Sequence, residues 1–320
     1  MVANKFELKP GGATREAFGK TLVELGRESK DVVVCDADLS KSTYTHLFAK
    51  EFPERFFSCG IAESNMVAIG AGLASAGKTA FVSSFSAFVL NKGLEQLRVT
   101  AAYPNVPLKV VGTHSGISIG EDGPSQMSIE DISLACSLPG FAVFSPADEV
   151  AMAAIMKLAA AHPGPVFIRA GRAKTLVVYG PEQQFEIGKA IELVTGTDVV
   201  LIAHGLMVAE SLKAVDLLAA EGISAGVVDM HTIKPIDREA ITRAAQVGAI
   251  VVSEEHLVDC GLGVRVAQVL SETKPCIVEY VGVQNTYAES GTPDAILDKY
   301  GLRAANVADA AKRALARKRG

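Results

Sequence analysis

The sequence RFFSCGIAESNMVAIGAGLASAGKTAFVSSFSAF, at residues 55–88, is the stretch that decides the fold. Its apolar run at 56–59 predicts a strand that stops at Gly60 and is soon followed by Glu63. The small and apolar residues after Glu63 predict a tightly packed helix. A carboxylate between a strand end and a helix start lies at the edge of a parallel sheet, where open α/β folds bind ligands. A first-turn Glu that only complements the helix dipole explains the position equally well.

Length and composition restrict the class of protein. The chain has 320 residues, 49% of them hydrophobic, and a net charge of −5, so it is long enough for two domains. The absence of a basic stripe predicts no nucleic-acid partner. No apolar run reaches the roughly 18 residues of a membrane span, and the N-terminus lacks the apolar core of a signal peptide. The five scattered cysteines indicate reduced thiols in a cytoplasmic protein.

Strands and helices alternate in the first part of the chain. Continuous apolar runs predict strands that are covered on both faces and therefore belong to a parallel sheet. The predicted strands are at 31–36, 56–59, 79–84, 107–112, 141–144 and 165–169, and the predicted helices at 14–27, 91–102, 129–137 and 147–161. The last of these helices is expected to have Ser145 as N-cap, Pro146 as first residue and Asp148 in the capping-box position.

A second α/β unit follows the polar segment GPEQQFEIG at 180–188, which predicts a linker between domains at 1–185 and 186–320. Its predicted strands are at 198–203, 225–229, 249–253 and 276–281, and its predicted helices at 208–221, 238–246 and 263–273. Thr292 is expected to cap another helix, and a shorter terminal helix is expected from about Val307. The alternation predicts an α/β fold of two doubly wound domains with mainly parallel sheets.

The loop THSGISIGEDGPSQ, at 113–126, is the second informative stretch. It is long, polar and rich in glycine, and such loops are costly to order and usually functional. It contains His114 and the pair Glu121-Asp122. The alternating oxygen ligands of a calcium loop are missing, so no metal site is assigned to this chain.

Four segments now carry a resemblance: CGIAESNM at 59–66, VSSFSAF at 82–88, THSGISIGEDGPSQMSIED at 113–131 and HTIKPID at 231–237. They resemble the C-terminal half of transketolase, which comprises a pyrimidine-binding domain and a C-terminal domain. The family holds the cofactor diphosphate and its metal with a Gly-Asp-Gly signature in the N-terminal half, and this sequence has no Gly-Asp-Gly. The chain therefore resembles one subunit of a split transketolase, whose partner carries the diphosphate-binding domain.

The resemblance implies thiamine diphosphate as cofactor, with Mg²⁺ or Ca²⁺ bound mainly by the partner subunit, and a self-dimer of this chain. Glu63 matches the family carboxylic acid that hydrogen-bonds the pyrimidine N1′ and favours the imino tautomer of the cofactor. Phe85 matches the aromatic residue that stacks on the aminopyrimidine, and Phe88 stands three residues on. Plain core packing is the alternative for these two rings. Asp38 matches a residue of the inter-subunit hydrogen-bond network near the cofactor.

The resemblance also implies transfer of a two-carbon ketol group from a ketose phosphate to an aldose phosphate. The residues that match the family's sugar-phosphate positions are Arg15, Ser42, His114 and Arg172. Arginine suits phosphate because its planar fork donates two charge-assisted hydrogen bonds. Asp122 matches the residue that recognises a donor hydroxyl, and Gln126 stands where many members have His.

Three alternatives remain open. A deoxyxylulose-phosphate synthase relative typically has His at the position of Gln126, and the β subunit of a 2-oxo-acid dehydrogenase E1 component lacks the loop at 113–126. A non-catalytic partner subunit has no need of Glu63, Phe85 and Asp122. In the second half of the chain, His204, His231 and His256 are interpreted as structural or interface residues.

Overall fold

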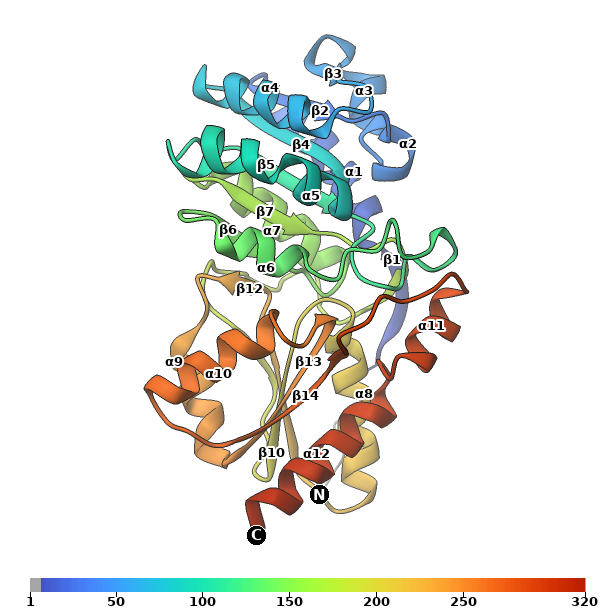
Figure 1. Cartoon of the computed structure of the whole chain (residues 1–320), viewed down its shortest axis with the longest axis vertical. Helices are drawn as coiled ribbons and strands as arrows, with labels where there is room; N and C mark the ends of the chain where they lie inside the picture. The colour runs from blue at the N-terminus through green and yellow to red at the C-terminus, as the bar shows by residue number, and fades with distance from the viewer. Residues whose placement is uncertain (1–6, 320) are drawn as a thin grey trace.

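The computed structural model describes residues 7–319, which form two α/β units stacked along the long axis of the molecule (Figure 1). The first unit is built on a seven-stranded sheet with the order β12-β6-β7-β5-β4-β2-β3. Its strands are β2 (Val32–Asp36), β3 (Phe56–Ser58), β4 (Thr79–Phe85), β5 (Lys109–Thr113), β6 (Ala142–Phe144), β7 (Val166–Arg169) and β12 (Thr232–Lys234). All neighbours pair in parallel except β12, which is antiparallel to β6.

Helices cover both faces of this sheet because successive strand residues point to opposite sides. Val33 and Cys35 of β2 pack into one apolar cluster with α4 and α5, whereas Val32 and Val34 pack into another with α1 and α7. The helices are α1 (Thr14–Glu28), α2 (Ser40–Thr43), α3 (His46–Glu51), α4 (Glu63–Ser75), α5 (Ser86–Gln96), α6 (Asp131–Ser137) and α7 (Glu149–Ala161). The predicted doubly wound arrangement is confirmed.

The second unit has a five-stranded sheet with the order β14-β13-β10-β11-β9, in which only β9 is antiparallel to its neighbour. Its strands are β9 (Ile191–Val194), β10 (Val199–Ala203), β11 (Ala225–Asp229), β13 (Ala249–Leu257) and β14 (Ile277–Val283). Its helices are α8 (Met207–Ala220), α9 (Arg238–Ala244), α10 (Leu262–Glu272), α11 (Pro293–Lys299) and α12 (Ala304–Arg319). Between the two units, β1 (Lys9–Ala13) pairs with β8 (Lys174–Val177) as an antiparallel ribbon.

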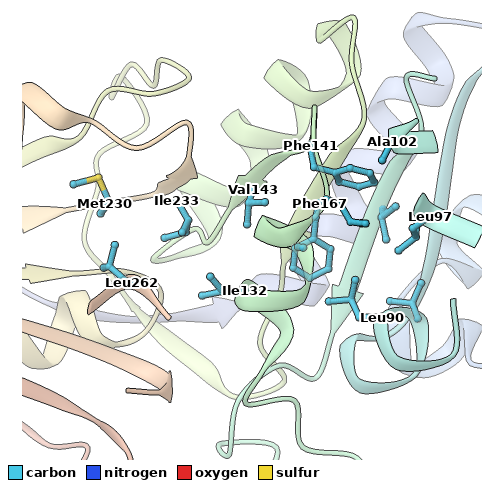
Figure 2. Close-up of a cluster of buried hydrophobic side chains, with 14 of the residues drawn as sticks. Leu90, Leu97, Ala102, Ile132, Phe141, Val143, Phe167, Met230, Ile233 and Leu262 are labelled. Atoms are coloured by element: carbon cyan, nitrogen blue, oxygen red, sulfur yellow. The ribbon is translucent and has the colours of Figure 1, made fainter. Parts of the chain in front are cut away.

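The two units share one apolar core. Met230 and Leu262 of the second unit join Ile132, Val143 and, from β12, Ile233 of the first in a single cluster of buried side chains, as Figure 2 shows. The motif HTIKPID supplies β12, so a strand from the later part of the chain completes the first sheet. The sequence pattern did not predict this, because three residues carry too little periodicity to indicate a strand.

Several predicted helix ends were wrong. The helix predicted at 91–102 already begins at Ser86, directly after β4, and continues as a π-helix at Leu97–Ala102. The N-cap of α7 is Asp148, not Ser145, because the Asp148 carboxylate accepts a hydrogen bond from the Ala151 N–H at 2.8 Å. The expected short terminal helix is α12, which has 16 residues and begins at Ala304.

The predicted cap of α11 is confirmed, whereas the predicted strand that corresponds to β13 was too short. Thr292 caps α11 as predicted, with its hydroxyl accepting from the Ala295 N–H at 3.4 Å. Strand β13 runs four residues past the predicted end at Ser253 and finishes at Leu257. Throughout residues 7–319, no helix combines the length and the apolar character that a membrane crossing requires.

Candidate functional site

Glu63 is the first residue of α4, just beyond the end of β3, as the sequence predicts. Its side chain is only 2% exposed, yet it carries a carboxylate. Ser84 Oγ donates to Glu63 Oε1 at 3.3 Å, and Lys92 Nζ donates to Oε2 at 3.2 Å. A buried carboxylate needs such partners because burial without them is costly. A surface first-turn Glu would complement the helix dipole without being buried, so the dipole alone does not account for this placement.

Lys92 connects this carboxylate to the two aromatic rings of the motif. Its ammonium lies 4.9 Å from the centroid of the Phe88 ring, and its side chain is 52% exposed. Phe88 is half-buried and lies nearly parallel to Phe85, with the ring centroids 5.4 Å apart. Lys92 therefore links the Glu63 carboxylate and the ring of Phe88 at one edge of the sheet.

Phe85 connects the aromatic pair to His114. The two rings are stacked with their centroids 3.8 Å apart, and Phe85 is 7% exposed. One face of Phe85 is thus covered by the imidazole, so Phe88 presents the more accessible ring. Sequence reasoning gave the two residues the opposite emphasis.

His114 is held as a neutral ring. Arg15 donates from a terminal nitrogen to His114 Nε2 at 3.0 Å, which makes Nε2 an acceptor. The proton then resides on Nδ1, which contacts Thr113 Oγ1 at 2.9 Å; this tautomer is assigned from the hydrogen-bond network. Burial, with the positive charges of Arg15 and Arg172, lowers the pKa of His114 to about 3.

Arg15 is the centre of a positively charged group at this edge. The same guanidinium nitrogen that contacts His114 donates to the carbonyl of Ser42 at 2.8 Å, and the guanidinium lies over the ring of Tyr44. Arg15 Nε is buried and has no hydrogen-bond partner. Burial and the nearby Arg172 lower the pKa of Arg15 from its ordinary value, while Tyr44 opposes the shift. An unpartnered donor on one cation, with a second cation nearby, favours an anionic ligand.

Arg172 lies on the same side, in contact with the glycine loop, the name used below for residues 113–126. It donates to the carbonyl of Ile119 at 3.0 Å and to Glu121 Oε2 at 2.9 Å. The structure therefore brings together Arg15, His114, Arg172 and the backbone of Ser42. It gives no side-chain hydrogen bond of Ser42 to this group among the described residues.

The remaining predicted residues lie on the rim rather than in this network. Asp122 is exposed, and its charge acts on Arg15. Gln126 accepts a hydrogen bond from its neighbour Ser125 at 2.9 Å. Asp38 is exposed with a positive φ of 64°, whereas the buried Asp36 receives the hydrogen bonds that hold this loop. Within residues 7–319, no three His, Cys, Asp or Glu side chains are grouped in a way that could hold a metal ion.

Sequence reasoning missed Lys92 and Tyr44. Lys92 lies four residues after Phe88 on the same helix, so helical spacing already placed it on the same face. Tyr44 lies between the short helices α2 and α3, which the periodicity did not predict, and it had no comparable signal. His204, His231 and His256 are buried, in agreement with their structural interpretation.

Comparisons with known proteins match nearly the whole chain. Residues 11–176 match the family "Transketolase, pyrimidine binding domain", and residues 188–307 match "Transketolase, C-terminal domain". A Methanocaldococcus jannaschii protein assigned as a transketolase C-terminal section is 42% identical, with 92% of this chain and 93% of that protein covered. The 6-deoxy-6-sulfo-D-fructose transketolase subunit SqwH of a Clostridium species is 37% identical, with 95% of both chains covered.

Longer relatives show which part of a transketolase this chain represents. Mouse transketolase-like protein 2 is 40% identical over 94% of this chain but only 48% of its own length, so the chain spans about half of that relative. A solved structure described as "Split gene transketolase, inactive beta4 tetramer" superposes with a TM-score of 0.90 and 48% identity, covering 96% of this chain and all of that one. The chain belongs to the transketolase family and corresponds to its pyrimidine-binding and C-terminal domains, as in split transketolases.

Proposed function

We propose that this chain is the subunit of a two-chain, thiamine-diphosphate-dependent transketolase that binds the pyrimidine end of the cofactor and the anionic group of the sugar. The observation that carries the proposal is the buried Glu63 carboxylate beside the accessible ring of Phe88, at the same sheet edge as the Arg15–His114 group. Neither group alone specifies this function. A carboxylate and an aromatic ring fit an aminopyrimidine, and the arginines fit a phosphate.

The residues present fit the pyrimidine end of the cofactor. Glu63 would hold the proton that it shares with the pyrimidine N1′, and Phe88, backed by Phe85, would stack on the ring. Ser84 donates to Oε1 of the Glu63 carboxylate and so orients the carboxylate. When bound, the cofactor supplies the nucleophile and electron sink for breaking and forming the carbon–carbon bond. We assign Mg²⁺ or Ca²⁺ to the partner subunit, where the diphosphate would lie.

The charged side chains of the site indicate the class of substrate. Arg15 has a buried nitrogen without a partner, and Arg172 is held by a half-exposed pair with Glu121, which an incoming phosphate can replace. His114 is neutral, so it adds no charge, and its hydrogen bond with Arg15 orients the guanidinium. Asp122 at the rim is suited to a sugar hydroxyl. We therefore propose sugar phosphates as substrates, with Gln126 and Asp38 as further contacts at the rim and the subunit boundary.

The lengths of the relatives support a proposal for how the complete enzyme is assembled from subunits. Two relatives of nearly the same extent as this chain are a transketolase section and a transketolase subunit, whereas mouse transketolase-like protein 2 is about twice as long. We propose a partner chain with the diphosphate-binding domain and a heterotetramer with two copies of each subunit. Exposed Ala68, Ile69 and Gly72 on α4 allow close approach of a second copy. The solved relative described as an inactive tetramer of one subunit supports self-association of the isolated chain.

Two smaller assignments belong to the same proposal. We place the boundary between the two domains at residues 185 and 186, within the segment after β8 that has no helix or strand. We also propose the cytoplasm as the compartment, because all five cysteines are free thiols.

Calorimetry tests the proposal directly. The isolated chain should bind thiamine diphosphate and Mg²⁺ too weakly to measure, because half a site offers little against the costs of holding a doubly charged ligand. Mixing with the partner chain should restore both cofactor binding and ketol transfer between a ketose phosphate and an aldose phosphate. Micromolar binding by the isolated chain would contradict the divided site, and a reconstituted complex without ketol transfer would contradict the function.

A further inference from the structure

The end of strand β13 enters the first domain. The extension of this strand beyond Ser253 contains Glu254, Glu255 and His256, all of them buried. Glu255 Oε1 accepts a hydrogen bond from the backbone N–H of Ser118 at 2.6 Å. Ser118 lies in the middle of the glycine loop, which also carries His114 and Asp122. A side chain of the C-terminal domain is thus bonded to the backbone of the loop that reaches the proposed substrate site.

Two glycines of the loop show how closely the C-terminal domain approaches. A Cβ atom added at Gly116 would lie 2.2 Å from the carboxyl carbon of Glu255, and one at Gly120 would lie 2.9 Å from the carbonyl oxygen of Gly291. Both glycines have positive φ, at 79° and 78°, a region that other residues rarely adopt. Figure 1 shows the loop beside α11, and its short 3₁₀ turn contacts that helix. The glycines are therefore required by the contact with the second domain.

Glu255 is itself held firmly. Arg169 of the first domain donates from one nitrogen to the backbone carbonyl of Glu255 at 2.8 Å, and from Nε to the Asp131 carboxylate at 2.9 Å. The N–H of Leu257 donates to the carbonyl of Ile129 at 2.9 Å. The strand end is consequently bonded at two residues, at Glu255 through its carboxylate and its backbone carbonyl and at Leu257 through its N–H. A long loop loses much conformational entropy when it is ordered, so a fixed acceptor in its middle is an effective constraint.

We infer that Glu255 is a positioning residue, through which the C-terminal domain holds the glycine loop in the shape that places His114 and Asp122 at the substrate. The effect of Glu255 on catalysis rests on the proposed function. The positioning of the loop by Glu255 does not rest on it. It also assigns a task to the C-terminal domain, which contributes no residue to the Arg15–His114 group. Glu255 contacts the backbone of the loop, so we expect it to act through the loop.

Hydrogen exchange on the full chain tests the positioning without any substrate. Glu255→Leu keeps the volume but removes the acceptor, so the Ser118 amide should exchange about tenfold to a hundredfold faster, the effect of losing a hydrogen bond to a charged group. Glu255→Gln keeps an oxygen acceptor and can donate to Ser118 Oγ, which has no partner, so it should stay near wild type. Glu279→Leu is the matched control, because Glu279 lies on β14 and pairs only with Arg313 and Arg317.

Two results would overturn the inference. One is unchanged exchange at 115–123 in Glu255→Leu, and the other is equal loosening in Glu279→Leu. If Glu255→Leu does not fold, Gly116→Ala approaches the same contact from the loop side and should loosen the same amides, and an unchanged loop in that variant would overturn the inference as well.

The kinetic consequence is measured in the complex with the partner subunit. Glu255→Leu should raise KM for the sugar phosphate about tenfold while kcat changes much less, and Glu255→Gln should restore KM, because the loop binds substrate and does not carry the chemistry. A loss confined to kcat would overturn the inference. A wild-type complex without ketol transfer would contradict the proposed function, whereas the exchange result would still decide the positioning.

Discussion

The sheet edge around Arg15 and the domain junction around Arg169 use the same residue type in opposite ways. At the edge, Arg15 Nε has no partner, and Arg172 donates to the half-exposed Glu121 and to the carbonyl of Ile119. At the junction, the Nε atom of Arg169 donates to both oxygens of Asp131, at 3.1 and 2.9 Å, and another nitrogen donates to two backbone carbonyls. The edge keeps hydrogen-bonding capacity free for a ligand, whereas the junction uses that capacity to join two domains.

The largest expected effect is at the junction. Asp131→Ala leaves the Arg169 charge buried without its partner and should lower the free energy of unfolding by about 3–5 kcal/mol. Although burial opposes the shift, Arg169 and His256 hold the pKa of Asp131 below its ordinary value, so its stabilisation is present above that value and is lost on acidification. Urea unfolding at pH 7 measures the loss.

Glu51→Ala is the matched control for this prediction. It removes the exposed partner of Arg27, whose surface pair should contribute less than about 1 kcal/mol. Equal losses in Asp131→Ala and Glu51→Ala would show that the junction pair has no special role in stability.

The next effect concerns the edge. Glu63→Gln should keep the fold and reduce the turnover of the reconstituted enzyme by about 10²-fold or more, the usual scale for a positioned proton transfer. The amide cannot share a proton with the pyrimidine as a carboxylic acid does. Steady-state ketol transfer measures the change, with circular dichroism as the check on folding. Turnover near that of the wild type would remove Glu63 from the proposed role.

The difference between the two regions also explains what the sequence predicts well. Strand β11 occupies the predicted residues 225–229, and α1 differs from its prediction by one residue at the C-terminal end. These elements follow from local periodicity. The N-cap of α7 does not, because Asp148 also accepts from the N–H groups of Val178 and Tyr179, about thirty residues further along the chain. A local capping rule cannot anticipate such a partner.

The same distinction applies to the site. Glu63, Phe85 and His114 lie in motifs that resemble a known family, and the structure brings them to one edge. Glu255 lies in the charged run Glu254-Glu255-His256, which directly follows the predicted end of a strand at Ser253. It becomes significant only when the folded chain brings it against Gly116. Contacts between domains are therefore the part of this molecule that sequence patterns leave out.

A smaller effect at the edge separates substrate binding from structure. Removing Arg172, as Arg172→Ala, should weaken transition-state binding of a phosphorylated acceptor by about 1.5–3 kcal/mol, the scale of a hydrogen bond to a charged group. Arg15→Ala should behave similarly. The loss should largely vanish with an unphosphorylated acceptor of the same length, measured as kcat/KM. An equal loss with both acceptors would indicate that these arginines hold the protein and not the phosphate.

The last effect comes from a second buried contact at the junction. Tyr179, after β8, donates its hydroxyl proton to Asp229 Oδ2 at the end of β11, at 2.5 Å. Burial, with help from Asp148 and against the hydrogen bond of Tyr179, raises the pKa of Asp229 from 3.8 to about 8. Between these values the folded chain keeps a proton that the unfolded chain has lost, so this group makes the protein less stable as the pH rises.

Asp229→Asn removes this titration while keeping an oxygen that can accept from Tyr179. The variant should gain stability relative to wild type as the pH rises from 4 to 8, because only wild type then loses its bound proton, whereas any cost of the new amide N–H₂ group acts equally at both pH values. Urea midpoints at the two pH values measure the difference, and other groups cancel between the two proteins. Asp216→Asn, at an exposed position on α8, controls for the change in net charge. A variant that loses stability relative to wild type between pH 4 and pH 8 would mean that the folded chain favours a charged Asp229, and the junction would then resemble the edge in holding a charge.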